Sequence, residues 1–296
     1  MSSKAIGWLR NRTSLSDWVI LALLFTIAAT FTIRLPAAPR ARSSWALHLG
    51  LLLAFGAVVG VMASRPRSRW VIWARAVATV AVLMFLYSSL GGPVFAIIPW
   101  RADRLLAGAD RALCGGHSPA LWAARHIGVA GLEFWSLIYG FFVPFLYLSI
   151  FLGCVGRPAP EREEFLIGFS VTYAIAYLGY LFLPSTGPIE FFPSVAPPPG
   201  GPLHRLILSS VAATGGNHGA FPSLHVGASA YLCLFDWRHS LLRGMTYAPV
   251  VALIGFSTLF LEYHYVVDLL AGIAIAVLAN RLAASSRPGR ASERLA

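Results

Sequence analysis

Long apolar runs recur along this chain of 296 residues and limit it to very few architectures. About 20 apolar residues, as a helix, are long enough to cross the roughly 30 Å hydrocarbon core of a bilayer. Lipid offers no partner to an unpaired backbone amide or carbonyl, so such runs cross as helices. With 57% hydrophobic and 12% charged residues, the composition lies outside the range of soluble domains. The sequence therefore predicts an all-α, polytopic transmembrane helical bundle.

The apolar runs predict about eight membrane spans. We expect them at residues 17–33, 45–63, 71–90, 132–155, 165–184, 221–237, 245–263 and 265–283. An even number of spans puts both termini on one side of the membrane, and Lys and Arg are more frequent in the termini and loops of that side. The positive-inside rule therefore predicts cytoplasmic termini in a cell (inner) membrane, although the loop with Arg34, Arg40 and Arg42 favours the opposite orientation.

The basic character of the chain fits the same interpretation. The formal net charge is +11, but the basic residues form short clusters between apolar runs and not one continuous face. Such clusters are typical of topology signals, so we predict a bilayer and not a nucleic acid as the partner. The three cysteines are dispersed and indicate neither a disulfide framework nor a metal site.

Two segments outside the spans have patterns of their own. In residues 101–122, apolar and charged side chains alternate at helical spacing, which predicts an amphipathic helix at the membrane interface or one packed on other loops. Its apolar side consists of Leu105, Leu106, Ala109 and Leu113, and its charged side of Arg101, Asp103, Arg104, Asp110 and Arg111. Residues 184–220 are rich in Pro and Gly and predict a long loop, either a lid or binding loop or a solvated linker.

Few ionisable residues lie at membrane depth, and they open two of the predicted spans. His225 lies at the start of the sixth span, and His264 and Asp268 lie at the start of the eighth. Such a group near the bilayer centre costs roughly 2.5–3.5 kcal/mol unless it faces a wet or paired site. The sixth and eighth spans begin on the same membrane face, so we expect His225 and His264 to meet there. His264 and Asp268, four residues apart on a helix, are expected to touch.

A contact between His264 and Asp268 would make the imidazole of His264 a better nucleophile. A carboxylate bonded to one imidazole nitrogen fixes the tautomer and leaves the other nitrogen unprotonated and nucleophilic. Three other interpretations stay open: helix caps or headgroup anchors, a zinc or iron site made with His225, and a proton relay in a transporter. No HExxH pattern or cysteine pair accompanies the metal interpretation, and no inverted repeat accompanies the transporter.

The residues around both histidines resemble a known family. "GAFPSLH" at 219–225 and "YHYVVDLLAG" at 263–272 are similar to the second and third motifs of the type 2 phosphatidic acid phosphatase (PAP2) superfamily. The resemblance covers roughly 101–281 and is strongest to the branch with inositol phosphorylceramide synthase and the sphingomyelin synthases. It implies a six-helix catalytic core within the bundle. We accordingly expect N-terminal spans at 1–95, a catalytic membrane domain at 96–284 and a disordered basic tail at 285–296.

The family mechanism, carried over by this resemblance, gives each of the three residues a role. His264 would be the nucleophile that attacks phosphorus and becomes a phosphohistidine. Asp268 would orient and activate it. His225 would protonate the leaving alkoxide and then activate the acceptor hydroxyl or water. The resemblance implies neither a metal nor a cofactor.

The resemblance fails at the family's basic residues. Hydrolytic members carry Lys and Arg in an upstream KxxxxxxRP motif and an Arg six residues before the nucleophilic His, but here that motif is absent and residue 258 is Thr. Other groups must then bind the phosphate. We predict that the first turn of the sixth span binds it, with Ser223 as a hydroxyl donor. His218 and Arg205 are further candidate donors, and each is equally well explained as a loop residue in water.

Together these features predict an integral membrane enzyme that acts on a phospholipid or polyprenyl phosphate through a phosphohistidine, with its site on the extracytoplasmic face. A transferase would move a phospho-headgroup such as phosphoinositol to a lipid alcohol, and the missing basic residues favour it. A phosphatase would use water instead. The alternative of another class is a proton-coupled transporter in which His225, His264 and Asp268 form the relay.

Overall fold

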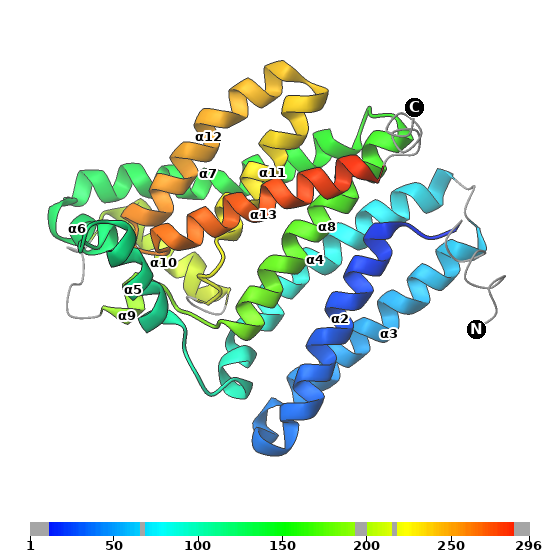
Figure 1. Ribbon diagram of the computed structural model, residues 1–296, viewed down its shortest axis with the longest axis horizontal. Coiled ribbons are helices and arrows are strands. Elements are labelled where there is room, and N and C mark those ends of the chain that lie inside the picture. Colours follow the sequence, from blue (N-terminus) through cyan, green and yellow to red (C-terminus); the bar gives the residue numbers. More distant parts are fainter. Residues whose placement is uncertain (1–11, 66–68, 193–199, 215–217, 287–296) are drawn as a thin grey trace.

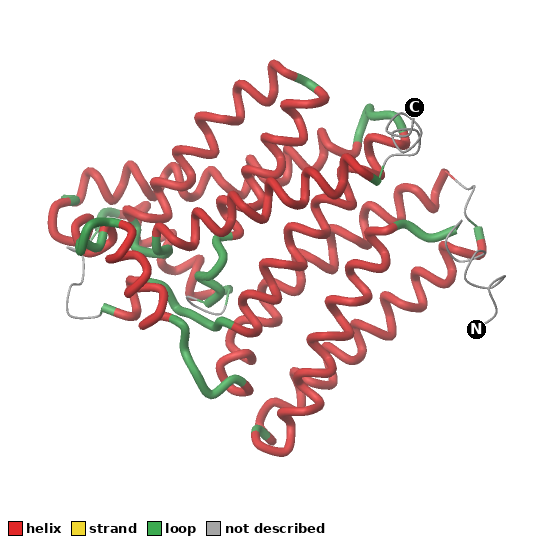
Figure 2. Tube along the Cα trace, viewed as in Figure 1, coloured by secondary structure: helices red, strands yellow, loops and turns green. Residues whose placement is uncertain are grey.

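The computed structural model describes residues 12–65, 69–192, 200–214 and 218–286, and the structural statements below concern these residues. Within them the chain forms helices joined by loops and short turns, without a β-strand (Figures 1 and 2). The predicted all-α bundle is confirmed.

Seven of the described helices are long and apolar enough to cross a membrane. They are α2 (Leu15–Arg34), α3 (Arg42–Ser64), α4 (Arg69–Ile97), α7 (Val129–Cys154), α8 (Ala159–Phe182), α12 (Leu241–Phe260) and α13 (Val266–Ser285). The sixth predicted span corresponds to α11 (Leu224–His239), which has 16 residues and is not one of the seven. A helix that faces lipid needs about 20 residues. Helix α11 instead packs against α8, α12 and α13 and is buried along most of its length.

Helix α8 lies at the centre of the bundle. In its most apolar stretch 78% of the residues are buried, against 28–33% in the other six long helices. Helices α2 and α4 pack on one side of α8, and α11 and α13 pack on the other (Figure 1). Helix α3 lies outside the first pair, and α12 and α7 lie outside the second. The outer helices therefore present their remaining apolar side chains to lipid.

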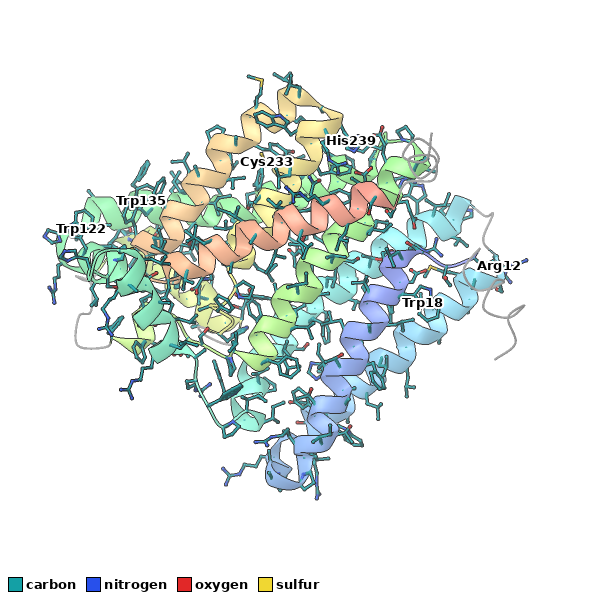
Figure 3. All side chains as sticks on the ribbon, in the orientation of Figure 1. Arg12, Trp18, Trp122, Trp135, Cys233 and His239 are labelled. Atoms are coloured by element: carbon teal, nitrogen blue, oxygen red, sulfur yellow. The ribbon has the colours of Figure 1, made fainter. Side chains whose placement is uncertain are left out.

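Exposed tryptophans mark the two ends of the bundle. Trp122 is 54% exposed and lies with Trp135 near one end, whereas Trp18 is 45% exposed and lies near the other (Figure 3). Tryptophan is enriched where a membrane meets water. This arrangement fits a bundle whose long helices cross a bilayer between these two levels.

Ion pairs hold the C-terminal end of α11. Arg157 pairs with Asp236, and it lies 3.1 Å from Glu161. Arg243 lies 3.0 Å from the same Asp236 carboxylate. Because Asp236 is buried, it needs such partners. The pairs join the α7–α8 and α11–α12 connections, and α2 begins and α13 ends toward this end of the bundle (Figure 1).

Helix α5 (Asp103–Leu113) forms within the predicted amphipathic segment, but the predicted faces are wrong in part. Asp103 and Asp110 were expected on the outer, charged side, and both are buried. Leu105 and Leu113, on the predicted apolar side, are 67% and 56% exposed, which fits a helix at the membrane interface better than one packed on other loops through this side.

Distant backbone amides explain the inward turn of these two carboxylates. Asp103 accepts the N–H groups of Thr186 and Gly187 at 3.0 and 2.9 Å, and Asp110 accepts the N–H of Val267 at 3.1 Å. Val267 lies in the first turn of α13, where helical amides have no partner within the helix. Helix α5 therefore fixes both the loop after α8 and the start of α13.

The predicted loop at 184–220 contains two helices, α9 (Pro188–Phe191) and α10 (Pro202–Ala213), while 193–199 and 215–217 lie outside the described residues. Helix α10 packs on α7. The carboxylate of Glu133 in α7 accepts the N–H of His204 at 2.8 Å, and the hydroxyl of Ser136 lies 3.0 Å from His204 Nδ1. Part of the loop is thus a helix fastened to the bundle.

Helices α11 and α13 cross in direct backbone contact. A Cβ atom on Gly272 of α13 would lie 2.6 Å from the carbonyl oxygen of Ser223 and 3.0 Å from the amide nitrogen of Gly227. The amide of Ser223 also donates to the carbonyl of Asp268 at 3.1 Å. Only glycine at 272 leaves room for this approach. The crossing brings the first residues of both helices together.

Replacing Gly272 by Ala should push α11 away from α13 and lower stability by about 1–3 kcal/mol, the usual cost of overpacking. Gly60→Ala in α3 is the control, because a Cβ there meets nothing within 4 Å and Ala favours a helix over Gly by up to ~1 kcal/mol. The thermal unfolding midpoint in detergent should fall for Gly272→Ala and hold or rise for Gly60→Ala. Equal midpoints for Gly272→Ala and wild type would contradict the close crossing.

Candidate active site

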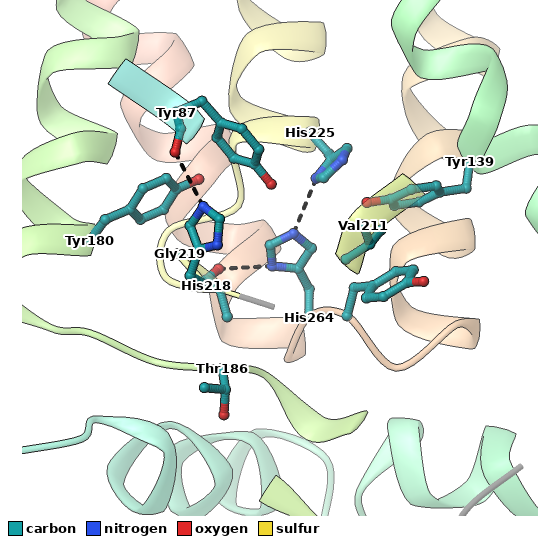
Figure 4. Close-up of a pocket in the computed structure, with 11 residues that line it drawn as sticks. Tyr87, Tyr139, Tyr180, Thr186, Val211, His218, Gly219, His225 and His264 are labelled. Atoms are coloured by element: carbon teal, nitrogen blue, oxygen red, sulfur yellow. Dashed lines mark hydrogen bonds between the residues drawn. The ribbon is translucent and has the colours of Figure 1, made fainter. Parts of the chain in front are cut away.

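Two histidines meet where α11 and α13 begin. His225 lies in the first turn of α11, and His264 lies in the connection that leads from α12 into α13. Nδ1 of His225 is 3.3 Å from Nε2 of His264, and the ring planes are inclined at 69° (Figure 4). The structure thus brings together two imidazoles that are 39 residues apart in the sequence.

The partners of His264 determine which of its nitrogens carries the proton. Nδ1 lies 2.8 Å from the carbonyl oxygen of Ala220. Because a carbonyl oxygen only accepts hydrogen bonds, Nδ1 is the protonated nitrogen. Nε2 therefore keeps its lone pair and accepts the hydrogen bond from His225. A lone pair directed out of the ring into the pocket is what a nucleophilic imidazole requires.

Asp268 supports both His264 and the start of α13. Its Oδ2 lies 3.4 Å from His264 Nδ1 and accepts the N–H of Tyr265 at 2.8 Å. Its Oδ1 is buried and has no hydrogen-bond partner within the described residues. We expected Asp268 to fix the tautomer of His264, and the structure shows that the carbonyl of Ala220 is the nearer acceptor. The carboxylate then acts mainly through its charge, which favours positive charge on the ring.

A small pocket surrounds the two histidines, and tyrosines make up much of its wall (Figure 4). Besides His225 and His264, it is lined by Tyr87, Tyr139, Tyr180, Thr186, Val211, His218, Gly219, Ala220 and Tyr263. The sequence does not single out these tyrosines, because a tyrosine near the end of an apolar span is typical of a membrane–water interface. Helices α4, α7, α8 and α10 each supply part of the wall.

A larger cavity of about 450 Å³ adjoins the histidine pocket. The two spaces share Tyr87, Tyr139, Val211 and His225. Most of the remaining wall is apolar and comes from α4, α7 and α10. It includes Val143 and Tyr147 of α7, which are half exposed on the flank of the bundle. An apolar cavity that reaches the flank and ends at His225, beside His264, is suited to hold a lipid chain with its headgroup at the imidazoles.

His218 stands across the pocket from His264 (Figure 4). Its Nε2 lies 3.2 Å from the carbonyl oxygen of Tyr87, so Nε2 carries the proton and Nδ1 is an acceptor. Nδ1 is buried and has no hydrogen-bond partner within the described part of the chain. The predicted donation from His218 to a phosphate would therefore need a second proton on the ring.

Ser223 and Arg205 do not line the histidine pocket. The hydroxyl of Ser223 is buried and caps α11, where it accepts the N–H of Val226 at 3.4 Å. The guanidinium of Arg205 donates to the carbonyl oxygen of Gly200 at 2.7 Å. Their contacts with a phosphate stay predictions.

Metal coordination would need a different arrangement of these side chains. Across the residues that the structure describes, no three His, Cys, Asp or Glu side chains are grouped to hold a metal ion. His264 lies between His225 and Asp268 and faces one with each ring nitrogen. The three groups therefore form a chain of hydrogen-bond partners and not a set of ligands around one point.

Glu262 is a buried carboxyl in the connection between α12 and α13. It is 2% exposed, and its backbone φ of 61° lies in the left-handed region. Burial raises the pKa of Glu262 to about 7. The acid is therefore neutral in mildly acidic solution and becomes a buried anion as the pH rises.

Comparison with known proteins yields one family. The sequence model of the PAP2 superfamily matches residues 104–282, more than half of the chain, and the match includes His225, His264 and Asp268. It begins after α4, so Tyr87 lies outside it. No curated protein and no solved structure matches the chain.

Glu262→Gln should remove a pH-dependent loss of stability. A carboxyl with a raised pKa contributes its full stability below the unfolded value of 4.5 and loses it as pH rises through about 7. The wild type should therefore lose up to about 3 kcal/mol relative to Glu262→Gln between pH 5 and pH 8.5. Thermal midpoints in detergent across this range measure the difference.

The exposed Glu190, in the neighbouring α9, supplies the control for this prediction. Glu190→Gln should follow the wild type at every pH, because the side chain of Glu190 is exposed to solvent. Parallel curves for wild type and Glu262→Gln would show that Glu262 does not titrate in this way.

Proposed function

The chain belongs to the PAP2 superfamily, and on that premise we propose that it is an integral membrane enzyme that transfers the phosphoryl group of a lipid phosphoester through a phosphohistidine on His264. The observation that supports the proposal most directly is the contact between His225 and His264 at the end of an apolar cavity. The family and the apolar helices support a lipid phosphatase or phosphotransferase in a membrane.

In the first step, the lone pair of His264 Nε2 attacks phosphorus. The bond from phosphorus to the lipid alcohol oxygen breaks, and its electron pair goes to that oxygen. His225, in its imidazolium form, gives the oxygen a proton and becomes neutral. The proton stays on His264 Nδ1, hydrogen-bonded to the carbonyl oxygen of Ala220. The negative charge of Asp268 stabilises the positive ring. A bound phosphate would take the place of the hydrogen bond between the two imidazoles.

In the second step, the acceptor hydroxyl attacks the phosphohistidine. Neutral His225 takes the hydroxyl proton, the bond from phosphorus to His264 Nε2 breaks, and the electron pair returns to that nitrogen. Both rings are then as they were at the start. A single imidazole can serve as acid and then as base because the two steps run through the same geometry in opposite directions.

We propose a lipid alcohol as the acceptor, which makes the reaction a headgroup transfer such as the transfer of phosphoinositol. The cavity that meets His225 is largely apolar and opens toward the flank of the bundle, so a second lipid can reach the imidazole from the bilayer. Water is the alternative acceptor and would make the enzyme a lipid phosphate phosphatase. We place the site on the extracytoplasmic face, since the histidines lie at the end of the bundle away from the start of α2 and the end of α13, where Lys and Arg are more frequent (Figure 1).

Incubation of the purified protein with a phospholipid labelled at phosphorus tests the proposal. Label should reach the protein in an acid-labile, alkali-stable linkage and then move to a new lipid. If water is the acceptor, label should move to a water-soluble phosphate, which is the headgroup phosphate from a diester or free phosphate from a monoester. His264→Ala should abolish both signals without changing the elution volume in detergent, and His126→Ala, an exposed histidine of α6 (Pro119–His126), should not affect them. Label on the His264→Ala protein, or its turnover at the wild-type rate, would exclude the phosphohistidine.

Asp268→Asn should slow the reaction by about 10- to 100-fold, the value of one hydrogen bond to a charged group. A triad in which the Asp alone fixes the tautomer loses about 10⁴-fold on the same change. The loss should be smaller here because the carbonyl of Ala220 still holds the Nδ1 proton. Single-turnover rates measure the effect; an unchanged rate would remove Asp268 from the mechanism, and a 10⁴-fold loss would show that Ala220 does not hold the tautomer.

A further inference from the structure

The wall of the histidine pocket carries no Lys, Arg, Asp or Glu side chain among the described residues. Two charged side chains contact wall residues from behind, and both are carboxylates. Asp268 lies beside His264, and Asp103 accepts the N–H of Thr186. The segments 193–199 and 215–217, which lie outside the described residues, contain no Lys or Arg in their sequence. A phosphate in this pocket therefore meets no fixed positive charge from them.

Two arginines of neighbouring segments are engaged elsewhere. The guanidinium of Arg101 lies 3.5 Å from the ring centroid of Phe95, which lines a small adjoining cavity. That cavity shares Tyr180, His218 and Gly219 with the histidine pocket, but Arg101 lines neither space. Arg205 donates to the carbonyl oxygen of Gly200. Neither arginine forms part of the wall of the histidine pocket.

Hydroxyl groups take the place of cations in this wall. Tyr87, Tyr139, Tyr180 and Tyr263 all line it, and the hydroxyls of Tyr87 and Tyr139 lie on either side of His225 in Figure 4. The hydroxyl of Tyr263 is buried and has no hydrogen-bond partner within the described residues. Leaving a buried hydroxyl unpaired is costly, and a ligand oxygen removes that cost. A tyrosine donates one hydrogen bond to a phosphate oxygen and adds no charge.

We propose that this tyrosine-lined wall binds the phosphate and selects one with a single negative charge, as in a phosphodiester, over the dianion of a phosphomonoester. The inference rests on the proposed function and names its substrate class. A phosphomonoester carries a charge of about −1.5 to −2 at pH 7, because its second pKa is near 6. A diester carries one negative charge at any pH near neutrality.

The positive charge that the proposed mechanism places beside the phosphate balances one negative charge on that phosphate. Buried beside His264, the ring of His225 gains its second proton only together with an anion. That proton then supplies one positive charge, and Asp268 offsets the positive charge that develops on His264. A diester phosphate is therefore neutralised by His225 alone. The second charge of a dianion would be buried without a partner, in a site that already has the carboxylates of Asp103 and Asp268 behind its wall.

Dioleoyl phosphatidylmethanol and dioleoyl phosphatidic acid form a suitable pair of probes, since they differ only in the methyl group that removes one charge. In both, Nε2 of His264 bonds to phosphorus, the bond from phosphorus to the diacylglycerol oxygen breaks, and His225 protonates that oxygen. Methyl phosphate stays on His264 in one case and phosphate in the other until an acceptor hydroxyl takes it, either that of a lipid alcohol included in the micelles or that of water. Diacylglycerol release in mixed micelles at pH 8 therefore reports both reactions.

The wild type should have a kcat/KM for phosphatidylmethanol at least 10-fold above that for phosphatidic acid. Val211→Arg should reverse or reduce this ratio, because Val211 lines the pocket and is only half-buried, so a cation there faces the phosphate. The comparison between variants cancels the intrinsic reactivity of the two esters. If Val211→Arg disturbs folding, Val211→Lys repeats the test, because its ammonium group is smaller than a guanidinium group.

Tyr263→Phe should lower kcat/KM for phosphatidylmethanol by about 10- to 100-fold, the value of a hydrogen bond to a charged group. Tyr247→Phe, in α12 and outside both cavities, is the matched control and should have the wild-type kcat/KM. Arg101→Gln and Arg205→Gln should keep the wild-type selectivity ratio, because neither arginine lines the pocket.

The outcomes separate this inference from the proposed function. Faster turnover of phosphatidic acid than of phosphatidylmethanol, with label on His264, would overturn the charge selection and leave the phosphohistidine mechanism standing. A selectivity ratio that collapses in Arg101→Gln or Arg205→Gln would likewise assign the phosphate to an arginine. Turnover of neither lipid and no label on the protein would overturn both.

Discussion

At the crossing of α11 and α13, the carbonyl of Ser223 rests against Gly272 with no side chain between the two helices. This contact fixes the distance between the two helix starts, and the remaining features of the site follow from it. It places His225 against His264 and aligns the amide of Ser223 with the carbonyl of Asp268. Packing in membranes depends on such small residues, because lipid provides no hydrophobic force that presses helices together. The chemistry of the pocket therefore depends on the absence of one methyl group.

The sequence predicts that the two histidines meet, because helical spacing and membrane topology follow rules that hold along the whole chain. Placing His264 and Asp268 four residues apart at the start of a span, and His225 at the start of another, predicts that they meet on one face. The same regularity predicts the seven long helices. The sixth predicted span, α11, is shorter than these seven and is buried by its neighbours, because an apolar run against protein and one against lipid look alike until the neighbours are known.

The rest of the site was beyond prediction because it depends on partners far apart in the chain. Asp110 turns inward to an amide 157 residues away, and Asp103 to amides more than 80 residues away, so helix periodicity alone put both carboxylates on the wrong side of α5. Tyr87 reaches the pocket from α4, which precedes the part of the chain that matches the family. The carbonyl of Ala220, which sets the tautomer of His264, has no sequence signature at all.

The apolar cavity and the histidine pocket share four wall residues, and the cavity of about 450 Å³ reaches the flank of the bundle along α7. In the proposed enzyme, this single chamber serves the outgoing alcohol and the incoming acceptor by turns. Donor and acceptor would occupy the same cavity at different times, as in double-displacement kinetics. Each lipid would therefore compete with the other for entry into the cavity. An excess of either lipid in the surrounding leaflet would then slow turnover, so the rate would depend on the lipid composition of the membrane.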